Sequence, residues 1–403
     1  MTDLIIIGAG PGGYKAAVYA AKHGLKVVIF EDVNVGGTCL NVGCIPTKTY
    51  VHSATFAEAV ERQQQVVEAL RGGVETLLSH PNITLVREKG VFIDAHTVSG
   101  YTAPNIIVAT GSSPKMLPIA GVDNPRVVDS TGLLQLKALP KKLCIIGAGV
   151  IGMEFASVFQ RFGSEVTVIE YLKECLPMVD SDIAKRLRKL LEKRGITFRM
   201  KTAVQDLSEI DADIILMATG RKPNVSADFA NAGFDYDERK GIAVNDDFET
   251  SVKGIYAIGD VNSRQMLAHA AEMQGIHVVN RILGIEDKIR FEVMPAAIFT
   301  EPEAACVGPT EDQLKEAGTA FECHKAFYRA NGKALAMNET EGMVKLCCEP
   351  EEGKLLSAHV FGAHAADLVQ EVTAYITLGA TLRQLRETVH IHPTLSEVLI
   401  EVN

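Results

Sequence analysis

Two distant stretches of this sequence repeat one pattern: an apolar strand, three glycines and an acid at the end of the next strand. The runs are LIIIGAGPGG, from residue 4, and LCIIGAGVIG, from residue 143. The glycines are Gly8, Gly10 and Gly13 in the first copy and Gly147, Gly149 and Gly152 in the second. The acids are Glu31 and Glu170, each 23 positions after its first glycine. This repeat constrains the fold more than any other feature of the chain.

The repeated pattern predicts two dinucleotide-binding units. Glycine lets the backbone turn sharply and approach a pyrophosphate, the following helix offers its N-terminal amides, and the acid accepts ribose hydroxyls. We therefore expect an α/β fold with two Rossmann-like βαβ units, each a sheet between layers of helices.

The similarity of the two halves continues further along the chain. NIIVATGSSP, with Gly111, is echoed by DIILMATGRKP, with Gly220. The first half is longer, because 80 positions separate Glu31 from Gly111 and 50 separate Glu170 from Gly220. The extra residues fall at GGTCLNVGCIPTK and at a helical pattern over residues 55–78. One dinucleotide unit has thus gained an insertion with two thiols.

The two thiols of the insertion, Cys39 and Cys44, can be a metal site, a staple or a redox pair. A zinc site needs two more ligands, and this spacing is unusual for zinc, so no metal is expected here. On a regular helix the two Cα atoms would be roughly 9 Å apart, too far for a disulfide. If the bond forms, residues 40–43 must depart from a regular helix, and Pro46 suits the first turn of the next one. A cysteine pair beside a bound dinucleotide suggests electron transfer to or from a disulfide.

The C-terminal third has a different pattern. GIYAIGDVN returns as a short strand ending at Gly259 and Asp260, and a helix is expected from about Leu267. From about residue 291 the runs VMPAAIFT, GMVKLCCE and KLLSAHVFG predict antiparallel strands, with helices over 367–378 and 393–401. This part is expected to be a separate α+β domain.

Composition excludes several classes of protein. A formal charge of -10 argues against nucleic acid or an anionic membrane as the main partner. No run approaches a membrane span, and the N-terminus does not look like a signal peptide, so a cytoplasmic location is expected.

In that compartment the eight cysteines should mostly be free thiols, and any disulfide should be catalytic rather than structural. The neighbours Cys347 and Cys348 should point to opposite faces of a strand. The other expectations are core positions for Cys144 and Cys306, and structural or surface positions for Cys175 and Cys323.

These motifs together, with the terminal HIHPTLSE, resemble the flavin-dependent disulfide reductases, and among them the dihydrolipoamide dehydrogenases. The resemblance covers nearly the whole chain in the family's order. It implies an FAD-binding domain over 1–135, an NAD-binding domain over 136–253, a return to the FAD domain over 254–290 and a dimerisation domain over 291–403.

The resemblance also implies the catalytic residues. Cys39 is similar to the thiol that attacks lipoamide, and Cys44 to the thiol that lies against the flavin. Lys48 and Glu154 match an ion pair beside the reactive edge of the flavin. The remaining pair, His392 and Glu397, matches the family's base and its orienting carboxylate, which reach the site from the second subunit of a homodimer.

The implied cofactors are FAD and NAD. The glycines and acids that match are Gly8, Gly10, Gly13, Glu31, Gly111 and Asp260 for the first copy and its return, and Gly147, Gly149, Gly152, Glu170 and Gly220 for the second. NAD is expected rather than NADP, because residues 170–173 keep the ribose-binding acid and lack arginine.

The implied reaction is oxidation of protein-bound dihydrolipoamide by NAD⁺, with the lipoyl group on another protein of a 2-oxoacid dehydrogenase or glycine cleavage complex. Glutathione reductase, mercuric reductase and a non-catalytic flavin-binding subunit are the alternatives. The chain is short for the family, which predicts trimmed β excursions in both nucleotide domains.

Overall fold

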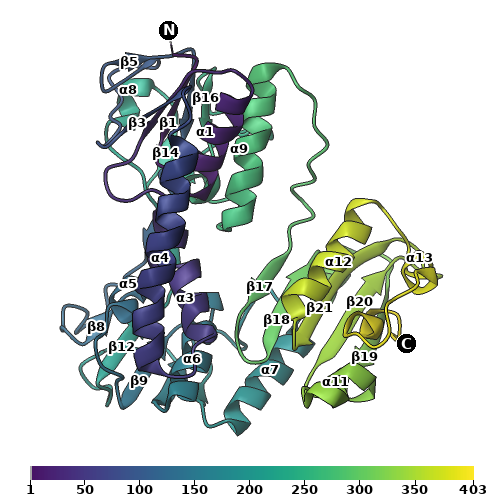
Figure 1. Ribbon diagram of the computed structural model, residues 1–403. Helices are drawn as coiled ribbons and strands as arrows, with labels where there is room; N and C mark the ends of the chain where they lie inside the picture. The colour runs from purple at the N-terminus through teal and green to yellow at the C-terminus, as the bar shows by residue number, and fades with distance from the viewer. Residues whose placement is uncertain (1) are drawn as a thin grey trace. The chain divides into compact units, whose positions relative to one another are not determined.

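The computed structural model describes residues 2–403 and divides into two compact units (Figure 1). The first unit holds the residues up to 115 together with 130–137 and 220–289. The second holds 116–129, 138–219 and 290–403. Each unit contains one copy of the glycine pattern.

The first unit is built on a five-stranded sheet of order β16-β6-β1-β2-β3, and every neighbouring pair of its strands is parallel. The strands are β1 (Leu4–Ile7), β2 (Val27–Phe30), β3 (Ile83–Val86), β6 (Asn105–Val108) and β16 (Ile255–Ala257). Uninterrupted apolar runs such as LIII and VVIF form strands here because a parallel sheet with helices on its faces buries both sides of each strand. The return segment thus supplies the edge strand β16 of the first sheet.

Helices of this unit pack together beside the sheet, and Figure 1 shows α1 and α9 side by side. The helices are α1 (Pro11–Lys22), α2 (Gly37–Val42), α3 (Cys44–Val51), α4 (Phe56–Leu78), α5 (Ser130–Leu134), α8 (Phe229–Ala232), η1 (Gly259–Asn262) and α9 (Ala268–Leu283). Three two-stranded pairs complete the unit: β4 (Thr97–Val98) with β5 (Tyr101–Thr102), β7 (Ser112–Pro114) with β13 (Arg221–Pro223), and β14 (Tyr236–Asp237) with β15 (Gly241–Ile242). The helix predicted over 55–78 is confirmed, with Thr55 as its N-cap.

The second unit contains a second parallel sheet, of order β11-β10-β9-β12-β8. Its strands are β8 (Val127–Val128), β9 (Lys142–Ile146), β10 (Glu165–Ile169), β11 (Thr197–Arg199) and β12 (Ile214–Met217), and its helices are α6 (Val150–Phe162) and α7 (Ser181–Lys193). Between β11 and β12 the chain forms no strand. The second nucleotide-binding sheet therefore has no additional strands between β11 and β12, as the predicted trimming of this domain requires.

The C-terminal part of the second unit is an antiparallel sheet of order β17-β18-β21-β20-β19, with α12 across it (Figure 1). Its strands are β17 (Ala296–Ile298), β18 (Glu303–Val307), β19 (Glu322–Phe327), β20 (Met343–Cys348) and β21 (Leu355–Gly362). Its helices are α10 (Glu311–Glu316), η2 (Tyr328–Ala330), α11 (Gly332–Met337), α12 (Ala365–Thr377), α13 (Leu382–Glu387) and η3 (Ser396–Leu399). The α/β fold with two dinucleotide-type sheets and a C-terminal α+β part is confirmed.

The helix predicted over 393–401 is wrong in length, because only the 3₁₀ turn η3 forms there. The apolar residues Val398, Leu399 and Val402 are buried in the core under the antiparallel sheet. Tertiary packing of these side chains, rather than helical propensity, sets the local backbone.

A disulfide joins Cys323 of β19 to Cys347 of β20. The two residues are directly opposite each other in the antiparallel pair, with Cα atoms 4.2 Å apart. The expectation that any disulfide is catalytic rather than structural is therefore wrong for this pair, which crosslinks two strands. The sequence does not predict this disulfide, because the two cysteines are 24 residues apart and meet only through the register of β19 and β20.

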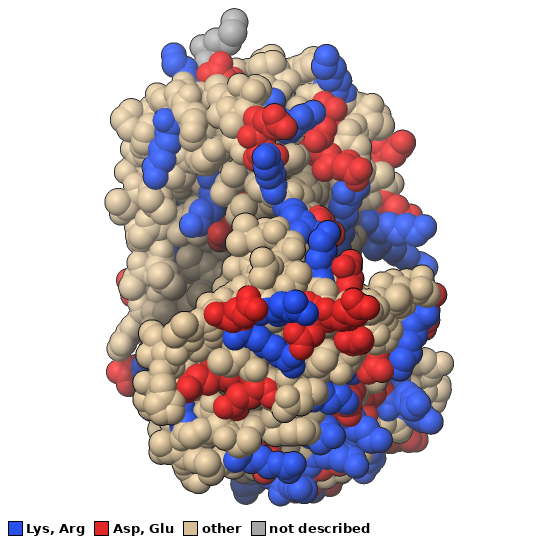
Figure 2. All heavy atoms as spheres, turned by 90° about the vertical axis from the view of Figure 1, so that its right-hand side faces the viewer, with Lys and Arg blue, Asp and Glu red and all other residues tan. Residues whose placement is uncertain are grey.

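On the face shown in Figure 2, charged side chains of both signs are interspersed, and Lys and Arg side chains gather along its lower edge. Within residues 2–403, no helix is long and apolar enough to cross a membrane.

Candidate functional site

The first glycine loop is held in a conformation that only glycine fits. Gly8 has φ +102°, and a Cβ there would lie 2.4 Å from the carbonyl oxygen of Ala109. A Cβ on Gly13, in the first turn of α1, would lie 1.9 Å from the oxygen of Gly8. Strand, loop and helix therefore approach one another at backbone distance, as a pyrophosphate-binding turn requires.

Glu31 lies against this loop. Its Oε2 accepts a hydrogen bond from the amide of Ala9 at 2.9 Å, and its Oε1 accepts one from Val33 at 3.1 Å. The carboxylate at the end of β2 is thus fixed beside the turn, where a ribose hydroxyl of a bound dinucleotide is expected.

The second loop repeats this geometry within the second unit. A Cβ on Gly147 would lie 2.4 Å from the oxygen of Ala218, and one on Gly152 would lie 2.0 Å from the oxygen of Gly147. Glu170 accepts hydrogen bonds from Ala148 at 2.6 Å and from Leu172 at 2.8 Å. The two halves therefore share one backbone design as well as one sequence pattern.

Both loops leave room for a ligand in front of the helix. No atom lies within 4 Å of a Cβ built at Gly149, and at Gly10 the nearest atom, the Cα of Gly37, is at 4.0 Å. Neither α1 nor α6 has a side-chain N-cap, so side chains leave their N-terminal amides available to a phosphate. The residues at both loops fit the pyrophosphate of a dinucleotide, and the assignment of FAD to the first loop and NAD to the second stays a prediction.

The return segment places Asp260 in η1, directly after β16. Its Oδ2 accepts a hydrogen bond from Ser112 and lies 3.8 Å from Nε of Arg221. Gly111, just before Ser112, and Gly220, just before Arg221, both belong to the first unit and lead into the β7–β13 pair.

Sequence reasoning missed Ser112 and Arg221, although each adjoins a glycine that it did select. It also missed Gln274 of α9, whose Oε1 accepts hydrogen bonds from Gly259 at 2.8 Å and from Asn262 at 3.0 Å. The helix predicted from about Leu267 is confirmed, with Leu267 as an N-cap that makes no side-chain hydrogen bond.

The cysteine motif forms two short helices, α2 and α3, which meet at Gly43. Gly43 has φ −137° and ψ −112°, which breaks the helix between the cysteines, as the disulfide argument requires. Pro46 lies in the first turn of α3, as predicted. Asn41, which sequence reasoning did not select, anchors the motif by donating hydrogen bonds from Nδ2 to the oxygens of Val35 at 3.0 Å and Gly37 at 2.8 Å.

The break brings the two thiols together. Cys39 and Cys44 are in the thiol form, and their mutual hydrogen bond, followed by burial and the charge of Cys44, raises the pKa of Cys39. The positive charge of Lys48, one turn further along α3, lowers the pKa of Cys39. The contact between the two thiols therefore disfavours the Cys39 thiolate.

Glu154 lies in α6 of the second unit with only 3% of its surface exposed, and its Oε1 accepts a hydrogen bond from the amide of Phe299 at 2.9 Å. Lys48 belongs to the first unit. The ion pair between the two residues stays a prediction.

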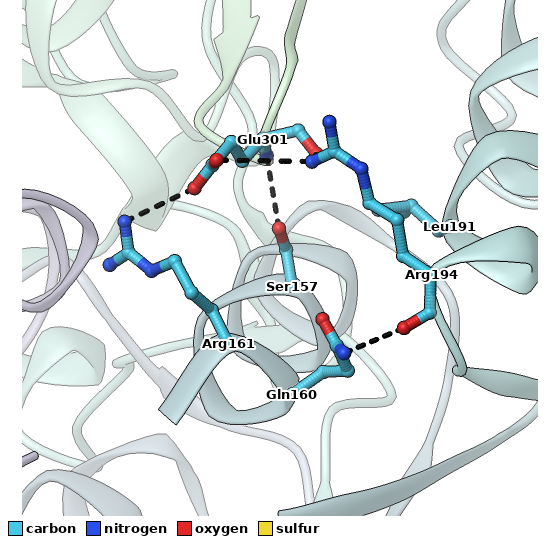
Figure 3. A pocket seen from close by; sticks show the side chains of 6 residues that line it. All are labelled: Ser157, Gln160, Arg161, Leu191, Arg194 and Glu301. Carbon is cyan, nitrogen blue, oxygen red and sulfur yellow. Dashed lines mark hydrogen bonds and ion pairs between the residues drawn. The ribbon is translucent and has the colours of Figure 1, made fainter. Parts of the chain in front are cut away.

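A pocket of about 400 Å³ lies beside the same helix (Figure 3). Glu301 lines this pocket. Its carboxylate lies 3.1 Å from the Arg161 guanidinium, and its backbone amide donates a hydrogen bond to the Ser157 hydroxyl at 2.9 Å. The backbone oxygen of Glu301 accepts a hydrogen bond from Arg194 at 2.6 Å. Because these groups bond to one another, they attach the chain segment after β17 to α6. The pocket lacks the glycine loop that a dinucleotide would need.

His392 and Glu397 are in contact, as expected. His392 Nδ1 lies 2.8 Å from Glu397 Oε1, and the other oxygen accepts a hydrogen bond from the amide of Thr394 at 2.8 Å. The Thr394 amide, and then His392, hold the pKa of Glu397 below its ordinary value. The His392 side chain itself is 79% exposed.

We call the two glycine loops, at residues 8–13 and 147–152, the first and the second dinucleotide cradle. A disulfide-exchange motif in the same unit as the first cradle, and a second cradle in the same chain, define a nucleotide-dependent disulfide oxidoreductase. The family model for pyridine nucleotide-disulphide oxidoreductases matches residues 2–275, and the model for the dimerisation domain of that family matches residues 294–402. The chain belongs to this family, and FAD and NAD are its cofactors.

Relatives include the mitochondrial dihydrolipoyl dehydrogenase of Pisum sativum, 36% identical over 99% of this chain and 90% of that protein. The dihydrolipoyl dehydrogenase of Chlamydia muridarum is 37% identical, with coverages of 99% and 95%. Among solved structures, the HOCl-induced flavoprotein disulfide reductase RclA from Escherichia coli has a TM-score of 0.93 and 32% identity, and 99% of each chain is covered. The alignment with the pea protein spans 451 positions, more than the 403 residues here, so this chain lacks internal segments that its relative has.

Proposed function

We propose that this enzyme oxidises protein-bound dihydrolipoamide with NAD⁺, and that Cys39 and Cys44 are the exchange pair. The observation that carries the proposal is the hydrogen-bonded thiol pair at the Gly43 break, in the same unit as the first dinucleotide cradle. The full-length similarity to dihydrolipoyl dehydrogenases supports lipoamide as the substrate.

The exchange begins with the oxidised Cys39–Cys44 disulfide. The base His392 removes a proton from one substrate thiol, and the thiolate attacks the Cys39 sulfur and expels Cys44 as a thiolate. The second substrate thiol then displaces Cys39, which takes up a proton as lipoamide leaves. When bound, FAD supplies the chemistry that takes an electron pair from the dithiol and delivers it to NAD⁺.

Glu397 orients the imidazole in this scheme. Its hydrogen bond to Nδ1 leaves Nε2 for the substrate proton and stabilises the imidazolium that forms. Because the pKa of Glu397 is lowered, this support persists into acidic solution.

The active form is a homodimer in this proposal. The side chains of Val389 and Ile391, next to the base, are 95% and 79% exposed, and that of Leu378 is 84% exposed. Apolar residues this exposed, two of them close to His392 in the sequence, fit an interface that a second subunit covers. The match of residues 294–402 to the family's dimerisation domain supports the same conclusion.

The lipoyl group would be carried by a protein of a 2-oxoacid dehydrogenase or glycine cleavage complex. A cytoplasmic location remains a prediction of the sequence. Glu170, with no arginine among residues 170–173, favours NAD over NADP.

The test is a steady-state comparison of two reactions of the purified holoenzyme: dihydrolipoamide with NAD⁺, and glutathione disulfide with NADPH. We expect a much larger kcat/KM in the first reaction and its loss in Cys44→Ser, with Cys306→Ser, a buried thiol of β18, as the matched control. A larger kcat/KM with glutathione disulfide, or an active Cys44→Ser variant, would refute the proposal.

A further inference from the structure

Three potential metal ligands, none of them a residue of the proposed reaction, meet on one face of the antiparallel pair β19–β20. Glu322 and His324 are two positions apart on β19 and therefore share a face. Cys348 of β20 is the register partner of Glu322. The intervening position, Cys323, forms its disulfide with Cys347, so neither of those sulfurs is available as a thiolate ligand.

The ligand atoms are close enough to share one ion. One atom from each of the three side chains lies within 4.8 Å of the others. His324 Nε2 is 3.6 Å from Glu322 Oε2, which is too long for a hydrogen bond. Two such ligands on a tetrahedral zinc ion would be about 3.4 Å apart, from zinc–ligand bonds of about 2.0–2.1 Å. The Glu322–His324 pair is therefore within a few tenths of an ångström of this geometry, and rotation of side chains by about 1 Å would bring the third ligand atom to the same ion.

A second observation at this cluster is the imidazole nitrogen of His324. His324 Nε2 is buried from solvent and has no hydrogen-bond partner, which occurs at only two other side-chain atoms among the residues described. A buried polar atom without a hydrogen bond is costly, because it has lost its bonds to water, and the Glu322 carboxylate at 3.6 Å is too far to replace them. A cation between Nε2 and the carboxylate would satisfy both groups.

The other two ligands are available. Cys348 is a free thiol with no exposed surface. The second oxygen of Glu322 accepts a long hydrogen bond, 3.4 Å, from the amide of Glu351, which holds the carboxylate at the strand end. The charges closest to the thiol are mainly acidic, since Glu322, Glu349 and Glu352 outnumber Arg386. The local field thus favours a cation.

We propose that Glu322, His324 and Cys348 bind a zinc ion, with the carboxylate oxygen, Nε2 and the thiolate as ligands and water in the fourth position. Nitrogen, sulfur and oxygen donors in one set are typical of zinc. Binding replaces the proton of the Cys348 thiol with the metal and releases that proton to solvent. The ion would join the ends of β19 and β20 on the face opposite the disulfide.

The test uses the air-oxidised holoenzyme, stripped of metal with a chelator and titrated with Zn²⁺ alone by calorimetry. We expect one zinc ion per chain, and a loss of affinity of about tenfold or more in Glu322→Gln and in His324→Gln. Because the Glu322 side chain is 45% exposed, its replacement should leave the fold intact. X-ray absorption at the zinc edge should report one sulfur neighbour.

Two control variants separate this site from other thiols. Zinc binding should be unchanged in Cys306→Ser and in Cys39→Ser. Loss of binding in Cys39→Ser, two sulfur neighbours at the zinc edge, or unchanged affinity in both ligand variants would overturn the proposal, as would the absence of zinc binding to the wild type.

Discussion

Replacing Gly152 with alanine tests the second dinucleotide cradle. The new Cβ would lie 2.0 Å from the carbonyl oxygen of Gly147, and contacts under 3.0 Å essentially do not occur in proteins. The opposing atom is backbone, so α6 must move away from the loop by about 1 Å. A misplacement of about 1 Å can cost about a hundredfold in rate, or ~2.7 kcal/mol. We therefore expect kcat/KM for NAD⁺ to fall about a hundredfold in Gly152→Ala.

The assay is the initial rate of NADH formation at saturating dihydrolipoamide, with FAD occupancy measured from the visible absorbance of the same sample. FAD should be retained, because its cradle lies in the other unit. The matched control is Gly73→Ala on the exposed face of α4, where a Cβ meets no atom within 4 Å. That variant should keep its activity and gain up to ~1 kcal/mol of stability. A kcat/KM within twofold of wild type in Gly152→Ala, or loss of FAD rather than of NAD⁺ turnover, would refute the reasoning.

Three further predictions concern the charged groups of the second unit. Asp180→Ala removes one of the two carboxylates that bind the buried Lys345 ammonium, the one 2.8 Å away, while Glu311 still binds it. It should lower the free energy of unfolding by ~1.5–3 kcal/mol in urea titrations, and Asp180→Ala with Lys345→Met should recover part of the loss. Hydrogen bonds from Lys315 and Lys345 lower the pKa of Glu311 to about 2 from 4.5, so its stabilising effect is present above pH 4.5 and is lost as the pH falls towards 2. Glu311→Gln should flatten the dependence of unfolding free energy on pH in that window; an unchanged slope would contradict the assignment. Glu397→Gln should reduce kcat about tenfold or more with little change in KM for NAD⁺, and equal effects on both constants would contradict an orienting role.

Much of the fold follows from local patterns in the sequence. The strand, loop and helix around Gly8 and Gly147 are predictable because apolar runs, glycines and acids lie within one short βαβ unit. The break at Gly43 is predictable too, because a regular helix cannot bring Cys39 and Cys44 together.

Other features depend on which distant residues meet. The Cys323–Cys347 disulfide and the contact of Lys345 with Asp180 require strand registers that no local pattern encodes. The chain after Pro393 has helical spacing, yet its backbone follows the buried side chains of Val398 and Leu399. The sequence thus predicts short-range geometry well and long-range pairing poorly.

The most direct test of the account is the visible spectrum of the purified protein, recorded without oxygen before and after about one equivalent of dihydrolipoamide. The account predicts a flavin spectrum that gains a long-wavelength absorption band when the Cys39–Cys44 disulfide is reduced, and no such band in Cys44→Ser. A protein that binds flavin but whose spectrum does not respond to dihydrolipoamide would contradict the proposed substrate, and a protein without flavin would contradict the assignment of the first glycine loop.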